Sequence, residues 1–172
     1  MNLPNKITIS RISLIPVFII LFYVLETQHK NIILGILFAV MAFGDFLDGY
    51  IARKTNKITE FGTLLDPIAD KLTTIVVIIL YIGNGIPAWM ALILISRDMI
   101  VSGLSIFALE FKKRIRVSKM GKAKTLIEMI SLILIILEIN FGTILLGIAA
   151  IFSIISGIDY TFKGIREIKK GF

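Results

Sequence analysis

The sequence predicts an all-α, polytopic membrane protein with six transmembrane helices, and three observations support that fold class. Hydrophobic residues make up 56% of the 172 residues, and the mean hydropathy is +0.90, which is unusually apolar for a soluble domain. Apolar stretches recur along the whole chain, and several reach the roughly 17–25 residues that a helix needs to cross a bilayer. They lack the alternation of a membrane β-barrel. We therefore expect one membrane domain over residues 1–172.

The apolar stretches divide the chain into six expected spans. A short N-terminal juxtamembrane segment, NLPNKITISR, precedes the first span, and Pro4 within it suits the start of a helix. The turn sequence GNGIP, at Gly83–Pro87, separates the third span from the fourth. The spans expected are Ile12–Leu25, Ile32–Leu47, Leu64–Ile82, Ala88–Leu109, Thr125–Leu137 and Thr143–Tyr160.

The distribution of positive charge predicts the orientation of these spans. A net charge of +7 could indicate a nucleic-acid partner, but in a membrane protein Lys and Arg mark the cytoplasmic loops. With six spans, Lys30 alone falls on one side, Lys71 and Arg97 fall within spans, and the other 16 share the opposite side. These 16 are Lys6, Arg11, Arg53, Lys54, Lys57, Lys112, Lys113, Arg114, Arg116, Lys119, Lys122, Lys124, Lys163, Arg166, Lys169 and Lys170. We expect a multi-pass protein of the cell membrane, both termini cytoplasmic, with no nucleic-acid partner.

Four aspartates, Asp45, Asp48, Asp66 and Asp70, lie close together in this apolar chain. Charged side chains at depth in a bilayer are costly and call for compensation. Asp45 and Asp48 have i, i+3 spacing and Asp66 and Asp70 have i, i+4 spacing, so each pair shares a helix face. The two helices should pack antiparallel, because their connection is short, and their carboxylates can then converge. The alternative is a set of helix-end aspartates that extend into water, but an aspartate at a helix C-terminus opposes the helix dipole.

Converging carboxylates require cations. Oxygen ligands without histidine or cysteine favour Mg²⁺, Mn²⁺ or Ca²⁺ over zinc, and two divalent ions would balance the charge. The chain has no cysteine, which also excludes thiolate chemistry. Gly49, Ala52 and Gly62 lie on the same helix faces and leave room for a ligand, while Arg53 adds a cation. The pattern indicates a site for a pyrophosphate, in which metal ions stabilise charge as a phosphorus–oxygen bond breaks.

From Asp45 to Asp70 the residues read D-x2-D-G-x2-A-R-x8-G-x3-D-x3-D. All eight fixed positions are present, and the pattern resembles the signature of the CDP-alcohol phosphatidyltransferase family. The resemblance implies a six-helix membrane fold, a homodimer and a site that opens to the cytoplasm. It also implies transfer of a phosphatidyl group from CDP-diacylglycerol to an alcohol, with release of CMP.

The same resemblance implies roles for individual residues. Asp45, Asp48 and Asp66 would be ligands of two Mg²⁺ or Mn²⁺ ions. Asp70 would be a ligand or the general base that deprotonates the acceptor hydroxyl. The cytidine nucleotide pocket would be lined by Gly49, Ala52, Arg53 and Gly62.

Other stretches resemble the bacterial phosphatidylglycerophosphate synthases within that family, which use glycerol 3-phosphate as acceptor. They are LPNKITISR (Leu3–Arg11), SRD (Ser96–Asp98), GKAKT (Gly121–Thr125) and SGIDY (Ser156–Tyr160). Glu128 departs from that group, where a neutral polar residue, often glutamine, is expected. Phosphatidylglycerol (for cardiolipin), inositol phosphate and serine therefore stay open as acceptors. A small cation transporter, with the aspartates as its ion path, is a remote alternative.

Three cations, Arg97, Lys122 and Lys124, are candidates for binding the acceptor's phosphate. A dianionic phosphate needs such cations, and arginine offers bidentate donors. The alternative for Arg97 is a buried ion pair with Asp98 that fixes helix packing.

Four further polar residues, Asn5, Thr8, Lys71 and Asp159, also have expected roles. Asn5 and Thr8 lie on the cytoplasmic approach, where they would contact the nucleotide or else cap and anchor the first helix. Lys71 is expected to extend to the interface or to pair with an aspartate. Asp159 is expected to have a structural role, paired with a cation such as Arg97.

Overall fold

The computed structural model describes the backbone of residues 3–55, 71–110, 115 and 118–169, and the side chains of residues 12–44, 71–108, 115 and 118–166. Within these ranges the elements are helices joined by turns and loops, with an isolated bridge between Ile82 and Ile86. The all-α prediction is therefore confirmed for the described residues. Their helices are α1 (Leu3–Val24), α2 (Lys30–Thr55), an unlabelled helix at Lys71–Leu80, α4 (Ala88–Glu110), α5 (Lys119–Ile136) and α6 (Phe141–Lys169).

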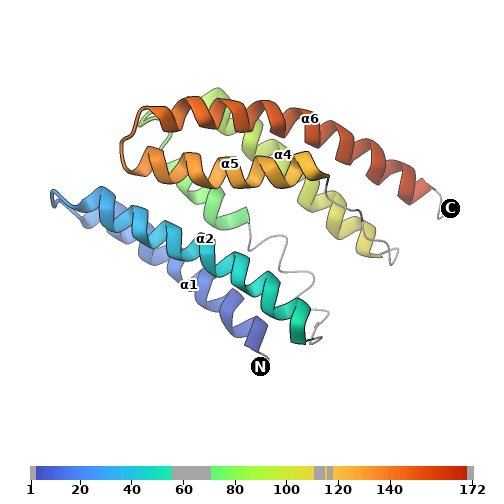
Figure 1. The fold of residues 1–172 in the computed structure, drawn as a ribbon, viewed down its shortest axis with the longest axis horizontal. Coiled ribbons are helices and arrows are strands. Elements are labelled where there is room, and N and C mark those ends of the chain that lie inside the picture. Colours follow the sequence, from blue (N-terminus) through green and yellow to red (C-terminus); the bar gives the residue numbers. More distant parts are fainter. Residues whose placement is uncertain (1–2, 56–70, 111–114, 116–117, 170–172) are drawn as a thin grey trace.

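The helices pack as two hairpins joined through α2 and α5. Helices α1 and α2 form one antiparallel pair and α5 and α6 form another, while α4 packs against α6 (Figure 1). The loops over residues 25–29, 81–87 and 137–140 gather at the left-hand end of the view, and the beginning of α1 and the end of α6 lie away from them. We call these two regions the loop end and the terminal end. From the loop end, the α1–α2 pair diverges from the α5–α6 pair toward the terminal end.

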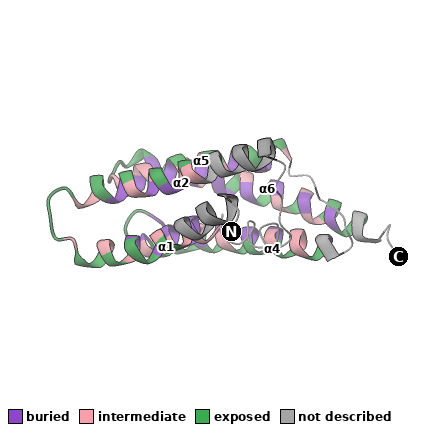
Figure 2. Ribbon diagram, turned by 90° about the horizontal axis from the view of Figure 1, so that it is seen from below, coloured by how far each residue is buried: buried purple, intermediate pink, exposed green. Residues whose placement is uncertain are grey.

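Each helix has a buried face and an exposed face, as the alternating colours along the ribbons show (Figure 2). The largest buried apolar side chains of the core are Phe18, Leu34, Phe38, Ile78, Ile86, Leu94, Leu132, Ile136 and Leu146. The outer faces are also apolar: Ile144, Ile151 and Ile158 of α6 are all more than half exposed. Apolar side chains on both faces suit a helix bundle surrounded by hydrocarbon.

The GNGIP turn forms where the sequence predicts it. Gly83 and Gly85 have φ values of +83° and +96°, a region that glycine enters at little cost and other residues avoid. The Asn84 N–H donates to the Tyr81 carbonyl at 2.9 Å. The Thr143 hydroxyl donates to the Gly85 carbonyl at 2.7 Å, which holds the turn against the start of α6.

The helices are longer than the apolar spans predicted from hydropathy. Helix α1 begins at Leu3, so the juxtamembrane segment is continuous with it; α2 continues to Thr55, and α6 continues to Lys169. Hydropathy marks only the apolar part of a helix, whereas lysine, arginine and glutamate continue its hydrogen bonding without penalty. At α5, Ser118 caps the helix by accepting a hydrogen bond from the Gly121 N–H at 3.1 Å.

Two described stretches, Ala88–Ala108 and Phe141–Arg166, are long and apolar enough to cross a membrane. Three other described helical stretches are apolar but shorter: Ile12–Val24, Lys30–Gly44 and Lys71–Leu80. Six transmembrane helices therefore stay a prediction.

Candidate active site

Helix α2 carries the first half of the aspartate motif. Asp45 and Asp48 lie on this one continuous helix, together with Gly49, Ala52 and Arg53. The i, i+3 spacing of the two aspartates consequently places them on one helix face, as predicted. Their side chains lie outside the described residues, as do those of Asn5 and Thr8 in α1. Residues that lie outside the described part altogether are Gly62, Asp66 and Asp70.

A group of five charged residues connects three helices, and one of the five, Lys71, directly follows this motif in the sequence. Asp98 of α4 is at its centre: its Oδ1 accepts from Arg97 Nη1 and from Lys124 Nζ, each at 2.9 Å. Its Oδ2 lies 3.1 Å from Nζ of Lys71, the first described residue after the motif. Lys124 also donates to Glu128 Oε2 at 2.8 Å, one turn along α5. We call Lys71, Arg97, Asp98, Lys124 and Glu128 the Asp98 cluster.

The Asp98 cluster is mostly buried, and its most exposed member, Lys71, is 18% exposed. The side chains of Lys124 and Glu128 are 0% exposed, and Asp98 is 2% exposed. Charges in such a place require partners, because desolvation of an unpaired ion is very costly. With every group ionised, the cluster holds three cations and two anions, so one positive charge is left for an anion. Arg97 Nε and Glu128 Oε1 also have no hydrogen-bond partner within the described part of the chain.

Helix α6 completes the surroundings of Arg97. Arg97 Nη2 donates to the Ser156 hydroxyl at 3.2 Å. Gly157 lies against the stem of Arg97 so closely that a Cβ atom there would be 2.8 Å from Arg97 Cγ. Glycine is therefore what allows α4 and α6 to approach at this point. Beside Arg97, a cavity of about 280 Å³ is walled mainly by isoleucine and phenylalanine, including Ile154 and Phe162.

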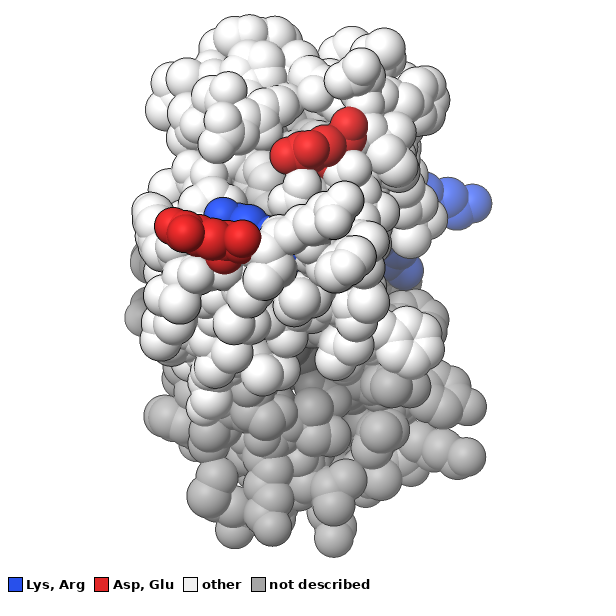
Figure 3. Space-filling model, turned by 90° about the vertical axis from the view of Figure 1, so that its left-hand side faces the viewer, with Lys and Arg blue, Asp and Glu red and all other residues white. Residues whose placement is uncertain are grey.

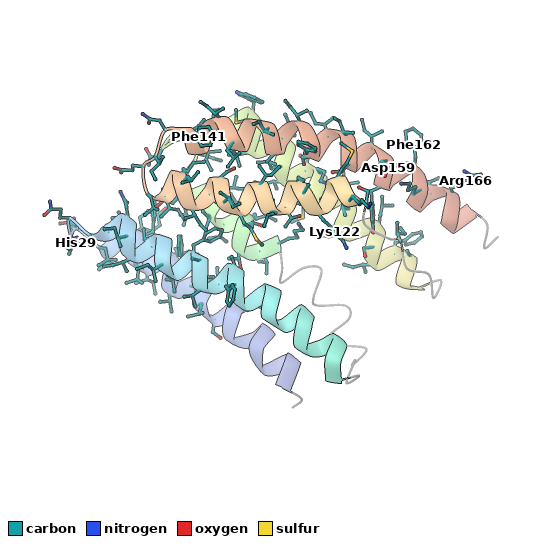
Figure 4. The ribbon with its side chains drawn as sticks, in the orientation of Figure 1. His29, Lys122, Phe141, Asp159, Phe162 and Arg166 are labelled. Atoms are coloured by element: carbon teal, nitrogen blue, oxygen red, sulfur yellow. The ribbon has the colours of Figure 1, made fainter. Side chains whose placement is uncertain are left out.

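Of the three cations predicted to bind a phosphate, the structure brings two together. Arg97 and Lys124 both contact Asp98, whereas Lys122 is exposed. Two residues along α5 from Lys124, Lys122 lies on a different face of the helix, near the beginning of α5 (Figure 4). The ion pair of Arg97 with Asp98, the alternative weighed from the sequence, is present. A contact with phosphate stays a prediction for all three.

The structure also tests the assignments of Lys71 and Asp159. Lys71 pairs with an aspartate, as predicted, and that aspartate is Asp98. Asp159 pairs with Lys163 at 2.7 Å and not with Arg97, so the partner named from the sequence is wrong. The reason is local: Asp159 and Lys163 are one turn apart on the exposed part of α6, while Ser156 and Gly157 contact Arg97.

The roles of Glu128 and Asp98 as partners of Lys124 were not predicted from the sequence. The i, i+4 spacing of Lys124 and Glu128 is a local signal that predicts this pair. No local signal joins Asp98 to Lys71 and Lys124, because these residues lie on separate helices.

Comparison with known proteins gives consistent matches. The family model of the CDP-alcohol phosphatidyltransferases matches residues 1–155. A curated relative from Rickettsia bellii is 39% identical over 176 residues, covering 96% of both chains. Relatives from Bacillus subtilis (34% identical, covering 98% of this chain and 97% of the relative) and Aquifex aeolicus (36%, covering 99% of both) are also similar. All three relatives are named CDP-diacylglycerol–glycerol-3-phosphate 3-phosphatidyltransferase.

Proposed function

The chain belongs to the CDP-alcohol phosphatidyltransferase family, and on this premise we propose that it transfers the phosphatidyl group of CDP-diacylglycerol to glycerol 3-phosphate. The products are phosphatidylglycerophosphate and CMP, which makes the chain an enzyme of phospholipid biosynthesis. The observation that carries this proposal is the similarity over 96–99% of the chain to relatives named for this reaction. The buried cations of the Asp98 cluster agree with an acceptor that bears a phosphate.

The aspartate motif would hold two Mg²⁺ or Mn²⁺ ions. Asp45, Asp48, Asp66 and Asp70 form a donor set of carboxylate oxygens, which fits these hard cations. Asp45 and Asp48 share one face of α2, as a joint site requires. When bound, the ions would neutralise negative charge on the diphosphate and on the departing CMP.

The chain's own residues perform the remaining steps. Asp70 takes the proton of the acceptor hydroxyl, whose oxygen attacks the lipid-side phosphorus. The bond from that phosphorus to the CMP oxygen breaks, and CMP leaves with the bonding electron pair. Asp45, Asp48 and Asp66 stay ionised throughout, as ligands. The nucleotide would be held by Gly49, Ala52, Arg53, Gly62, Asn5 and Thr8.

The Asp98 cluster would position the acceptor next to Asp70. Arg97 and Lys124 hold the acceptor's phosphate by charge-assisted hydrogen bonds, with Lys122 available at the exposed start of α5. Lys71 directly follows Asp70 in the chain and is fixed by Asp98. The same carboxylate therefore links the candidate general base to the cations that would bind the acceptor.

The chain would be a multi-pass protein of the cell membrane that crosses it six times, with both termini and the active site in the cytoplasm. The beginning of α1 and the end of α6 both lie away from the loop end (Figure 1). Among the described residues, the loop-end face is mostly uncharged (Figure 3), whereas 16 of the 19 Lys and Arg fall in the segments predicted to be cytoplasmic. The family resemblance supports a homodimer and one membrane domain over the chain.

Glu128 favours a second candidate function with a different acceptor. Its carboxylate partly neutralises Lys124 at 2.8 Å, which would suit an acceptor without a dianionic phosphate, such as serine. The chemistry would otherwise be the same.

A comparison of acceptors tests the proposed function. Purified protein is incubated with CDP-diacylglycerol and Mg²⁺, together with glycerol 3-phosphate, phosphatidylglycerol, inositol phosphate or serine, and CMP release is measured. We expect fast CMP release when glycerol 3-phosphate is the acceptor and slow release with each of the other three acceptors. Faster release with any other acceptor would overturn the substrate assignment.

A further inference from the structure

A second cavity lies at the loop end, far along the helices from the Asp98 cluster. Its volume is about 530 Å³, within the range of small-molecule sites. Residues of all three loops line it, at the end of the molecule that Figure 3 faces, and Phe22 and Ile135 add apolar surface. The cavity therefore has a polar part and an apolar part at the edge of the helix bundle.

Two opposite charges line this cavity without pairing. Lys30 begins α2 and Glu138 follows the end of α5. No salt bridge joins them to each other or to any other described residue; Nζ of Lys30 instead lies 4.8 Å from the centre of the Phe22 ring. Each charge is also placed against the helix dipole, since a lysine is unfavourable at a helix N-terminus and a glutamate at a C-terminus. Helix stability does not explain either residue.

The backbone conformation of Glu138 is a second indication that this residue has a functional role. Its φ is +59°, the left-handed region, and it is the one such non-glycine residue in the described chain. Glu138 N–H donates to the Ile135 carbonyl and Ile139 N–H to the Leu134 carbonyl, each at 2.9 Å. These bonds form the helix-ending motif whose left-handed position is usually glycine. A carboxylate stands here although glycine would fit the backbone better, and such strain commonly marks functional positions.

The cavity also contains a buried hydroxyl that lacks a partner. Tyr81 is 5% exposed, and its Oη makes no hydrogen bond within the described part of the chain. Asn31 and Asn84 line the same cavity and offer both donors and acceptors. A buried polar atom without a partner is costly unless a ligand or water satisfies it.

From these groups we propose that the loop-end cavity binds a phosphoethanolamine head group. The phosphate pairs with the ammonium of Lys30 and accepts hydrogen bonds from the side-chain amides of Asn31 and Asn84. The ethanolamine ammonium pairs with the carboxylate of Glu138 and donates a hydrogen bond to the Tyr81 oxygen. A ligand that carries both charges satisfies the two side chains that do not pair with each other. Phosphatidylethanolamine in the bilayer and a free phosphoethanolamine ester share this chemistry.

Thermal unfolding of the full-length protein in detergent micelles tests the site, with the fluorescence of Trp89 as the readout, since it is the chain's single tryptophan. The probes are phosphatidylethanolamine and phosphatidylglycerol mixed into the micelles, and soluble sn-glycero-3-phosphoethanolamine. A bound ligand raises the Tm in a saturable way. We expect phosphatidylethanolamine to bind at least tenfold more tightly than phosphatidylglycerol. Saturation by the soluble probe as well would show that the head group suffices; saturation by the lipid alone would show that acyl chains are also needed.

Two variants and a matched control sharpen the test. Glu138→Gly and Lys30→Gln should each weaken phosphatidylethanolamine binding at least tenfold. Glu138→Gly should also raise the Tm without lipid, because glycine suits the left-handed backbone, so lost binding cannot be a result of misfolding. Glu26→Gln, an exposed acidic residue outside the cavity lining, should leave binding unchanged. CMP release should stay at the wild-type rate in all three variants.

Three results would overturn the proposal. The first is equal stabilisation by both lipids, and the second is unchanged phosphatidylethanolamine binding in Glu138→Gly. The third is a lower Tm of Glu138→Gly without lipid, because that result would show that Glu138 has a structural role. Each is independent of whether CMP release follows the proposed function.

Discussion

In the Asp98 cluster, every charged side chain lies within 3.1 Å of an opposite charge. In the loop-end cavity, Lys30 and Glu138 line the same space and pair with no charged side chain among the described residues. The difference separates two uses of charge in an apolar protein. The paired charges of the Asp98 cluster hold helices together and leave one positive charge for an anion, whereas the two charges kept apart at the cavity suit a ligand that carries both signs.

The largest expected effect comes from removing the shared carboxylate of the Asp98 cluster. Asp98→Asn leaves Lys71, Arg97 and Lys124 together in a buried site with Glu128 as the remaining anion. Breaking a buried ion pair on one side typically costs about 3–5 kcal/mol. We expect a loss of that order in the free energy of unfolding, measured in mixed micelles, together with loss of CMP release. A stable, active Asp98→Asn protein would show that the cluster does not hold the three helices.

A smaller effect is expected where α6 meets Arg97. Gly157→Ala places a Cβ atom 2.8 Å from Arg97 Cγ, and overpacking of this kind costs about 1–3 kcal/mol. Gly103→Ala on α4 is the matched control, because a Cβ atom there meets nothing within 4 Å. Alanine should stabilise that helix by about 0.5–1 kcal/mol. Equal Tm values for the two variants would contradict close packing at Gly157.

Glu128 allows the charge balance of the cluster to be changed without removing its centre. Glu128→Gln removes the carboxylate that lies 2.8 Å from Lys124, so the site becomes more positive. If Lys124 binds the acceptor's phosphate, the KM for glycerol 3-phosphate should fall by at least about threefold, because a negative charge is removed beside that phosphate in a site that solvent screens little. The kinetics of CMP release at varied glycerol 3-phosphate measure this change. A KM that rises would show that Lys124 does not bind the acceptor's phosphate.

The smallest effect is expected at the exposed pair of Asp159 and Lys163, whose side chains are 40% and 57% exposed. Asp159→Asn should change the free energy of unfolding by about 0.3–0.5 kcal/mol, the usual value for an exposed i, i+4 helix pair. The same unfolding measurement used for Asp98→Asn provides the comparison. A loss as large as that of Asp98→Asn would mean that burial does not distinguish the two carboxylates.

The sequence predicted helix order and type well, because long apolar stretches and the GNGIP turn are local signals. It misplaced the ends of α1, α2 and α6, because the hydrogen bonding of a helix continues past the last apolar residue. In the candidate site, the motif spacing placed Asp45 and Asp48 on one helix face. The partners of Asp98 were not predicted, since Lys71 and Lys124 reach it from other helices.

The αL conformation of Glu138 illustrates a feature that no sequence pattern indicates. A glycine would have predicted a left-handed helix end, and a glutamate predicts the opposite. Such positions become visible only when the backbone is known.

The proposed transfer reaction requires divalent ions that the aspartate motif holds. The measurement that tests this requirement is CMP release from CDP-diacylglycerol and glycerol 3-phosphate, for the wild type and Asp66→Asn, first with EDTA and then with added Mg²⁺ or Mn²⁺. We predict that the wild type is inactive in EDTA and active with either ion, and that Asp66→Asn stays inactive with each while it unfolds at the wild-type Tm. Wild-type turnover by Asp66→Asn, or turnover in EDTA, would contradict the account.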